Sequence, residues 1–372
     1  MAKQYSKQHS KQHSKQYSVC RALAVSLAGL LLPSAPVSAI EWDWYGKLDL
    51  QALYTSHDLL RYADAGWQLE APFSRLGIKA GQAINDDLSW LAVYEWQVNG
   101  LDDANRGHRL GSRNTYIGLA SKRFGELTFG KNDSRFKKSE GKIDLFNETL
   151  ADMAQLVPGQ DRLENIVSYQ SAKLGLWQWG ASWQTGISDE VAGGYDWTIS
   201  YGDAGFASAP YYLAYARAQQ QASGSNLLTA DRLLAHLRLG DTPLGSWSAG
   251  LMWQHSSQQR LAANPAASLT TTQANTVRAG TGWLASVQLK RGQNSWKLQY
   301  VTDHSRSRHS QPGKGFSAGV EHALGSSPSN AVSLYGLVTS LRLAAPELAA
   351  SNVSATVPRR DNAIAAGLRW QF

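Results

Sequence analysis

The sequence predicts an all-β protein, namely a closed barrel of sixteen antiparallel strands that crosses a membrane. Three observations lead to this fold class. About sixteen segments alternate apolar and polar residues over eight or more positions, which is typical of strands with one apolar face. All nine prolines after residue 39 lie outside these segments, as strand interiors require. The apolar faces end in Trp and Tyr, while the opposite faces carry Arg, Lys, Glu and Gln, as in the aromatic girdles of membrane barrels.

The alternation is clearest in the middle and at the end of the chain. In "LWQWGASWQ", Trp177, Trp179 and Trp183 share one face and glutamines occupy the other. The last nine residues, "IAAGLRWQF", repeat the pattern up to Phe372. The expected strands lie near 42–54, 73–84, 88–99, 111–121, 124–132, 162–171, 174–185, 195–204, 211–220, 230–241, 245–257, 281–291, 295–304, 315–324, 331–343 and 362–372.

A soluble β-protein also has alternating strands, but its apolar faces fill a core between two sheets. In lipid every backbone polar group must be paired within the protein, so a sheet there has to close on itself. The terminal strand, with Leu368, Trp370 and Phe372 on its apolar face, is therefore expected to meet the first strand and close the barrel.

Residues 1–39 are interpreted as a cleaved signal peptide, which leaves residues 40–372 as a single barrel domain. Five basic residues and no acid precede or flank the apolar run "ALAVSLAGLLL", and small residues follow it. Without this segment the chain has 31 basic and 29 acidic residues, so the net charge of +7 falls to +2 and the indication of a nucleic-acid partner disappears. The single cysteine, Cys20, is removed with it, so no disulfide is expected.

About 30 residues separate the expected strands near 124–132 and 162–171, and most other connections are much shorter. Long connections of this kind are usually functional. Sixteen strands enclose an open aqueous lumen, into which such a segment can fold as a constriction. On the residues alone, a loop on the outer surface is the more ordinary outcome.

Several segments resemble the general porins of the Gram-negative outer membrane. The resemblance covers essentially all of residues 40–372 and rests on the terminal aromatic strand and on "YGKLDL" (45–50), "SRLGIKA" (74–80), "INDDLSWLAVYEW" (84–96), "SRNTYIGL" (112–119), "FGELTFGKND" (124–133) and "DRLENIVSYQS" (161–171). It implies a trimer of sixteen-stranded antiparallel barrels in the outer membrane, each with a long third loop folded into the lumen.

The resemblance also implies a charged constriction, in which basic residues of the wall face acids across the narrowest point. The matching wall cations are Lys47, Arg75, Arg113 and Arg162. The matching acids are Glu95 in the lumen, Asp152 on the loop and Asp161 before the next strand. Gly159 departs from the pattern, because the family often has Glu there, and the loop is a few residues longer.

Two other function classes are weighed against a diffusion pore. A barrel enzyme, such as a lipase or protease, is disfavoured because neither G-x-S-x-G nor H-E-x-x-H occurs and the histidines are scattered. A substrate-specific channel would show a ladder of aromatic residues in the lumen, whereas most aromatics here lie on the apolar faces. We therefore expect a water-filled outer-membrane channel for small hydrophilic solutes and ions, without cofactor or metal. Its expected partners are outer-membrane lipid and two further copies of the chain, and not nucleic acid.

Overall fold

The computed structural model describes residues 39–71, 73–99, 110–186, 193–223, 226–260, 277–305, 311–325, 331–344 and 360–372. The signal peptide expected at residues 1–39 lies, apart from Ala39, outside this description. Within the described residues, no helix is both long enough and apolar enough to cross a membrane.

The described elements belong to one antiparallel sheet and one long connection. The strands are β1 (Glu41–Thr55), β2 (Gly66–Glu70), β3 (Arg75–Ala83), β4 (Leu88–Val98), β5 (Leu110–Ser121), β6 (Gly125–Asp133), β7 (Arg162–Ser171), β8 (Trp177–Gln184), β9 (Tyr195–Gly202), β10 (Tyr211–Ser223), β11 (Asn226–Thr242), β12 (Gly245–Arg260), β13 (Val277–Arg291), β14 (Asn294–Asp303), β15 (Gly313–Ala323), β16 (Ala331–Leu343) and β17 (Arg360–Gln371). The connection between β6 and β7 carries α2 (Arg135–Lys138) and the short 3₁₀ helix η2 (Met153–Gln155).

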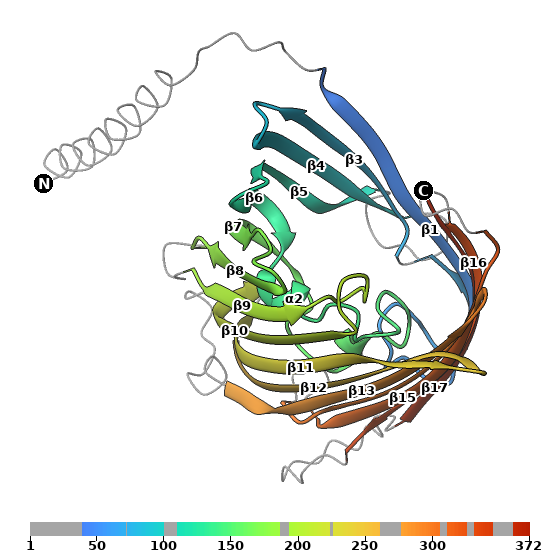
Figure 1. Ribbon diagram of the computed structural model, residues 1–372. Coiled ribbons are helices and arrows are strands. Elements are labelled where there is room, and N and C mark those ends of the chain that lie inside the picture. The colour runs from blue at the N-terminus through green and yellow to red at the C-terminus, as the bar shows by residue number, and fades with distance from the viewer. Residues whose placement is uncertain are drawn as a thin grey trace, which may run out of the picture. The chain divides into compact units, whose positions relative to one another are not determined.

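The seventeen strands occupy sixteen positions around the barrel. Both β2 and β3 pair with β1, β2 along Gln51–Thr55 and β3 along Glu41–Lys47, so together they form one interrupted strand. Every other strand pairs with its neighbours in sequence, and β17 returns to β1. Each of the sixteen predicted strands is present, and the closed sixteen-stranded antiparallel barrel is confirmed (Figure 1).

The closing contact joins β1 to β17 from Lys47 opposite Gln371 to Thr55 opposite Ala363. Phe372 extends it, because its carbonyl accepts a hydrogen bond from the Gly46 amide at 2.8 Å and its amide donates to the Gly46 carbonyl at 3.1 Å. A β-carbon on Gly46 would lie 2.5 Å from the Phe372 ring. Glycine is therefore needed where the last residue of the sequence crosses the first strand.

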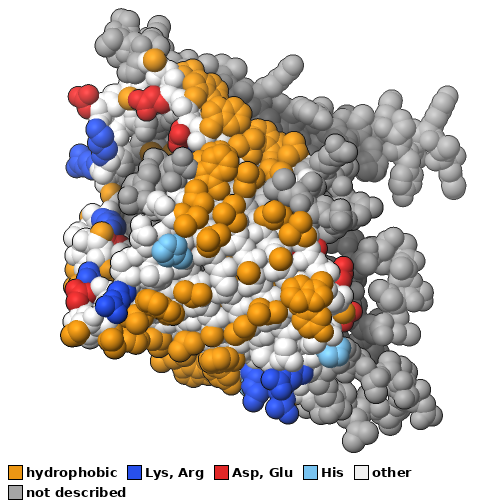
Figure 2. All heavy atoms as spheres, turned by 90° about the vertical axis from the view of Figure 1, so that its right-hand side faces the viewer, with side chains coloured by type: hydrophobic (Ala, Val, Ile, Leu, Met, Phe, Trp, Pro, Cys, Tyr) orange, Lys and Arg blue, Asp and Glu red, His pale blue; other side chains and the backbone are white. Residues whose placement is uncertain are grey.

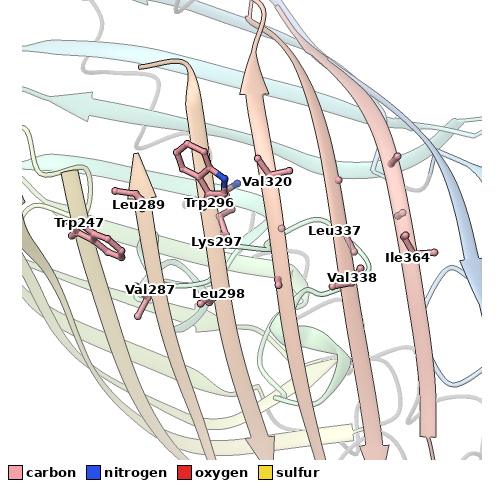
Figure 3. A pocket seen from close by; sticks show the side chains of 15 residues that line it. Trp247, Val287, Leu289, Trp296, Lys297, Leu298, Val320, Leu337, Val338 and Ile364 are labelled. Carbon is pink, nitrogen blue, oxygen red and sulfur yellow. The ribbon is translucent and has the colours of Figure 1, made fainter. Parts of the chain in front are cut away.

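Many large apolar side chains of the strands are exposed, the reverse of a soluble protein, and Figure 2 shows those on one side of the barrel. In β1, Leu50 and Tyr54 are exposed, whereas Asp49 and Gln51, on either side of Leu50, are buried on the inner side. Over β12 to β17 the outer face also contains a shallow groove of about 660 Å³, lined by large side chains such as Trp296 and Val338 (Figure 3). Exposed apolar area on this scale fits contact with lipid rather than with water.

Part of the inner face differs from the expected polar lining. Met252, Leu284, Val301 and Leu337, from β12, β13, β14 and β16, are buried on the inner side of the wall. They form one hydrophobic cluster with residues of the connection between β6 and β7. Apolar residues therefore line the wall where this connection packs against it.

Candidate functional site

A charged cluster lies where the connection between β6 and β7 meets the inner wall, and Glu148 is at its centre. Its carboxylate is 2.8 Å from Lys47 Nζ on β1, 2.6 Å from Arg75 Nη1 on β3 and 3.2 Å from Arg113 Nη2 on β5. One acid of the connection thus binds three cations from three strands, β1, β3 and β5. Charge-assisted hydrogen bonds of this length are among the stronger ones in proteins.

Glu95 on β4 is the second acid of this cluster. Its carboxylate lies 2.5 Å from Arg113 Nε and 3.6 Å from Arg75 Nε, and it accepts a hydrogen bond from the Tyr45 hydroxyl at 3.1 Å. The two arginines are therefore shared between a wall acid and an acid of the connection. This sharing fixes the orientation of both guanidinium groups.

The backbone around Glu148 is held in an uncommon conformation. Glu148 has a φ of +58°, in the left-handed region that few non-glycine residues adopt. Asp152 stabilises this turn, since its carboxylate accepts the Glu148 amide at 2.8 Å and, as the N-cap of η2, the Ala154 amide at 2.7 Å. Asp144 accepts the amides of Phe146 and Met153, both at 2.9 Å. The two aspartates thus fold the tip that presents Glu148 to the wall.

Apolar contacts attach the rest of the connection to the part of the wall that runs from β10 round to β1. Ile143, Phe146, Leu150 and Met153 are each at most 3% exposed and belong to the same cluster as Met252, Leu284, Val301 and Leu337. Full burial of such a side chain contributes about 1.5–3 kcal/mol. The segment between β6 and β7 lies inside the ring of strands, as Figure 1 shows around α2.

The residues predicted for the constriction are distributed over three environments. Lys47, Arg75, Arg113 and Glu95 meet around Glu148. Arg162 is instead near Asp133, with 3.8 Å between Nε and the carboxylate. Asp161 is exposed and lines a small cavity beside Glu148.

Asp152 does not contact the wall cations, because backbone amides occupy its carboxylate, and Glu148 makes these contacts. The sequence analysis did not single out Glu148. One signal could have found Glu148. Asp152 precedes a helical turn, so its carboxylate was a candidate N-cap, and Glu148, four residues earlier, was then the acid left to reach the wall cations.

A second chain of charges continues around the inner wall from the same cluster. Asp49 is 3.4 Å from Lys47 Nζ and 2.9 Å from Arg369 Nε on β17. Arg369 is 3.8 Å from Glu321, which pairs with Lys297 at 2.6 Å. The charges of the inner wall are thus organised as a connected belt from β1 to β14.

The acids of the connection have pKa values that are shifted in opposite directions. Burial alone would raise the pKa of Glu148, but the charges of Lys47 and Arg75 outweigh it and hold the pKa far below its ordinary value. Burial raises the pKa of Asp144 to about 7, and the nearby Asp152 carboxylate adds to the effect. Glu148 therefore carries its charge at any working pH, while Asp144 titrates near neutrality.

The described residues contain no group of three or more His, Cys, Asp or Glu side chains arranged to hold a metal ion. The arrangement they do show is a closed barrel with a charged inner belt, and a connection between β6 and β7 that packs against the inner wall through both ion pairs and apolar contacts.

The sequence profile of the Gram-negative porin family matches residues 22–342. The chain belongs to this family. Outer membrane protein U of Vibrio vulnificus (strain CMCP6) is 35% identical to this porin over 100 residues, which are 26% of this chain and 28% of that protein. Outer membrane porin C 2 of Shigella flexneri serotype 5a is 33% identical over 116 residues, 30% and 31% of the two chains. The porin thus matches less than a third of the length of each of these relatives.

Solved structures agree on the fold of this porin. An anion-selective porin from Comamonas acidovorans superposes with a TM-score of 0.66 at 17% identity, over 90% of this chain and all of that one. Salmonella typhi OmpF in complex with daunomycin gives a TM-score of 0.59 at 14% identity, over 89% and 97% of the two chains. At these identities the likeness establishes the barrel and nothing about selectivity.

Proposed function

We propose that this porin is a water-filled diffusion channel of the Gram-negative outer membrane, which passes small hydrophilic solutes and ions and catalyses no reaction. The observation that carries the proposal is the closed barrel with an apolar outer face and a charged belt on its inner face. An apolar exterior suits lipid, and a charged interior suits water and polar solutes.

The connection between β6 and β7 is proposed to narrow the lumen at Glu148. Two features support this role. Its tip binds Lys47, Arg75 and Arg113 on one part of the wall, and its apolar residues pack on the part formed by β12 to β16. Solutes would then pass beside the cluster, under the influence of Arg113, Arg162 and Glu95. Asp152 and Asp161 would act near this path, Asp152 by holding the tip in place.

The proposal includes export by residues 1–39 as a signal peptide and assembly into a homotrimer in outer-membrane lipid. The Vibrio cholerae OmpT structure that is described as a trimer form has a TM-score of 0.58 to this chain at 14% identity. Migration of the unheated purified protein on a denaturing gel, compared with the heated protein, tests the assembly.

Addition of the purified protein to a planar lipid bilayer tests the function. We expect stepwise, ohmic increases in conductance from a water-filled channel. Absence of channels would contradict the proposal. Saturable transport of a single solute class would favour a substrate-specific channel, and hydrolysis of lipid or peptide by the same sample would favour an enzyme.

A further inference from the structure

A cavity of about 110 Å³ lies beside Glu148, and four cations line it. They come from four different parts of the chain: Arg61 from the segment between β1 and β2, Arg113 from β5, Lys137 from α2 and Arg162 from β7. Gln97, Asn147, Gln155 and Gln160 also line the cavity. The side-chain amides of Asn147 and Gln155 each donate one hydrogen bond within the protein, to Glu140 and Leu150, and carry a second N–H. Its walls are therefore rich in groups that bind negative oxygen atoms.

Two of these cations have little charge compensation. Among the described residues, no carboxylate lies within 4.0 Å of the Arg61 guanidinium, which is instead 5.2 Å from the centre of the Tyr62 ring. For Arg162, Asp133 is the carboxylate within 4.0 Å in the described part of the chain, at 3.8 Å, and that acid is also bound by Lys137 at 2.8 Å; Glu95 and Glu148 act on Arg162 from farther away. The Nε atom of Arg162 is buried without a hydrogen-bond partner in the described part of the chain.

The acids of the cavity are largely engaged elsewhere. Glu148 binds three cations, of which Lys47 and Arg75 do not line the cavity. Asp152 accepts two backbone amides. Asp161 is exposed at the rim of the cavity, and its charge opposes anion binding.

Arg61 is held in place by ordered structure. The neighbouring Leu60 is 4% exposed and packs in the cluster that anchors the connection between β6 and β7. The Arg61 amide donates at 2.9 Å to Oε1 of Gln155, the last residue of η2. Asp361 on β17 accepts the amides of His57 and Leu59, which fixes the start of the segment. The guanidinium is thus carried on a preorganised turn, which reduces the entropy lost on binding.

The geometry points to a binding subsite for small oxyanions in this cavity, with Arg61 and Arg162 as its principal ligands. A guanidinium presents parallel donors that match two oxygens of a phosphate or carboxylate. A volume of about 110 Å³ accommodates a compact anion such as inorganic phosphate, but not a large solute. Binding at this subsite does not depend on the proposed function. Its consequence does, because phosphate and similar anions would be retained at the constriction only if the protein is a channel.

Calorimetric titration of the detergent-solubilised full-length protein with inorganic phosphate tests the subsite without requiring a channel. Loss of one charge-assisted contact should weaken binding about tenfold in Arg61→Gln and in Arg162→Gln. Arg61→Lys should show a smaller loss, because it keeps the charge but not the paired donors. Asp161→Asn should tighten binding, because it removes the opposing charge at the rim.

Arg217→Gln is the matched control, since Arg217 pairs with Asp231 at 3.0 Å and lies outside the cavity. It should bind phosphate as the wild-type protein does. A wild-type protein that does not bind phosphate, or equal binding by the Arg61→Gln, Arg162→Gln and wild-type proteins, would overturn the subsite.

Bilayer recordings on the same preparations separate the two proposals. Phosphate should block chloride current through the wild-type channel at concentrations about tenfold lower than those needed for Arg61→Gln. Channels without phosphate binding would leave the diffusion pore in place and refute the subsite. Phosphate binding that depends on Arg61, in a protein that forms no channel, would support the subsite and refute the pore.

Discussion

Replacing Glu148 with glutamine should shift the ion preference of the channel toward anions. The change keeps the size of the side chain but removes the negative charge that Lys47, Arg75 and Arg113 share. The local charge therefore becomes more positive by one unit at the proposed constriction. Because Glu148 is ionised at any working pH, the effect should be present across the usual experimental range.

The size of the shift follows from the distance at which a passing ion meets this charge. A unit charge about 4 Å away contributes about 1 kcal/mol in bulk water and about 4 kcal/mol at an effective permittivity of 20. Even the lower figure changes the local concentration of an ion about fivefold, upward for anions and downward for cations. We therefore expect the ratio of anion to cation permeability to rise at least about fivefold.

The reversal potential under a salt gradient measures this ratio. Salt near 0.1 M is preferable, because the screening length is then about 10 Å. Glu164→Gln is the control, since Glu164 has the same chemistry but is an exposed partner of Lys131 at 2.9 Å. Equal reversal potentials for Glu148→Gln, Glu164→Gln and the wild-type protein would show that Glu148 does not line the ion path.

Four further outcomes are expected. Arg113→Gln should shift the reversal potential toward cations, and an unchanged potential would place Arg113 away from the path. Asp152→Ala should cost about 1 kcal/mol of stability through loss of the N-cap, seen as a lower melting temperature; a melting temperature equal to wild type would contradict the capping role. Because burial raises the pKa of Asp144 to about 7, and that of Glu140 to about 8, the free energy of unfolding should fall as pH rises from about 4 to 7; Asp144→Asn should make this slope shallower in thermal melts, and an unchanged slope would assign it to the other acids. Deletion of Phe372 should lower the yield of heat-resistant barrel, since its two hydrogen bonds to Gly46 are lost; an unchanged yield would limit Phe372 to packing.

The strands were predictable because lipid outside and water inside impose an alternation of period two along every span. The exception is β2, whose five residues, "GWQLE", are too few to show a period. It is specified instead by its pairing with Gln51–Thr55 of β1, a contact between parts of the chain that local patterns do not reveal. The apolar part of the inner wall was not predicted, for a related reason. Met252 and Leu284 are apolar because the connection between β6 and β7 packs on them, and this contact is visible only in the folded protein.

The cations of the site were found through resemblance, because they lie on regular strands whose positions align with a known family. The acid that binds them lies on an irregular segment, where the direction of each side chain depends on turns. The carboxylate of Asp152 accepts hydrogen bonds from two backbone amides and therefore does not pair with the wall cations. Arg61 lies on the segment between β1 and β2, and its place in the cavity lining depends on the packing of Leu60 and on the hydrogen bond from its own amide to Gln155, which no local pattern indicates.

The contact between β1 and β17 also has a consequence for the order of assembly. All other neighbouring strands are close in sequence, so they can form successive hairpins at small cost in chain entropy. The seam between β1 and β17 instead joins Lys47 to Gln371, and closing a flexible loop of that length would cost on the order of 5 kcal/mol. Hairpins formed beforehand lower this cost by stiffening and curving the sheet. The pairing of β1 with β17 is therefore expected to form last and to open first. Until it forms, both strands have an unpaired edge, and an assembly factor or a second unfinished chain could bind there.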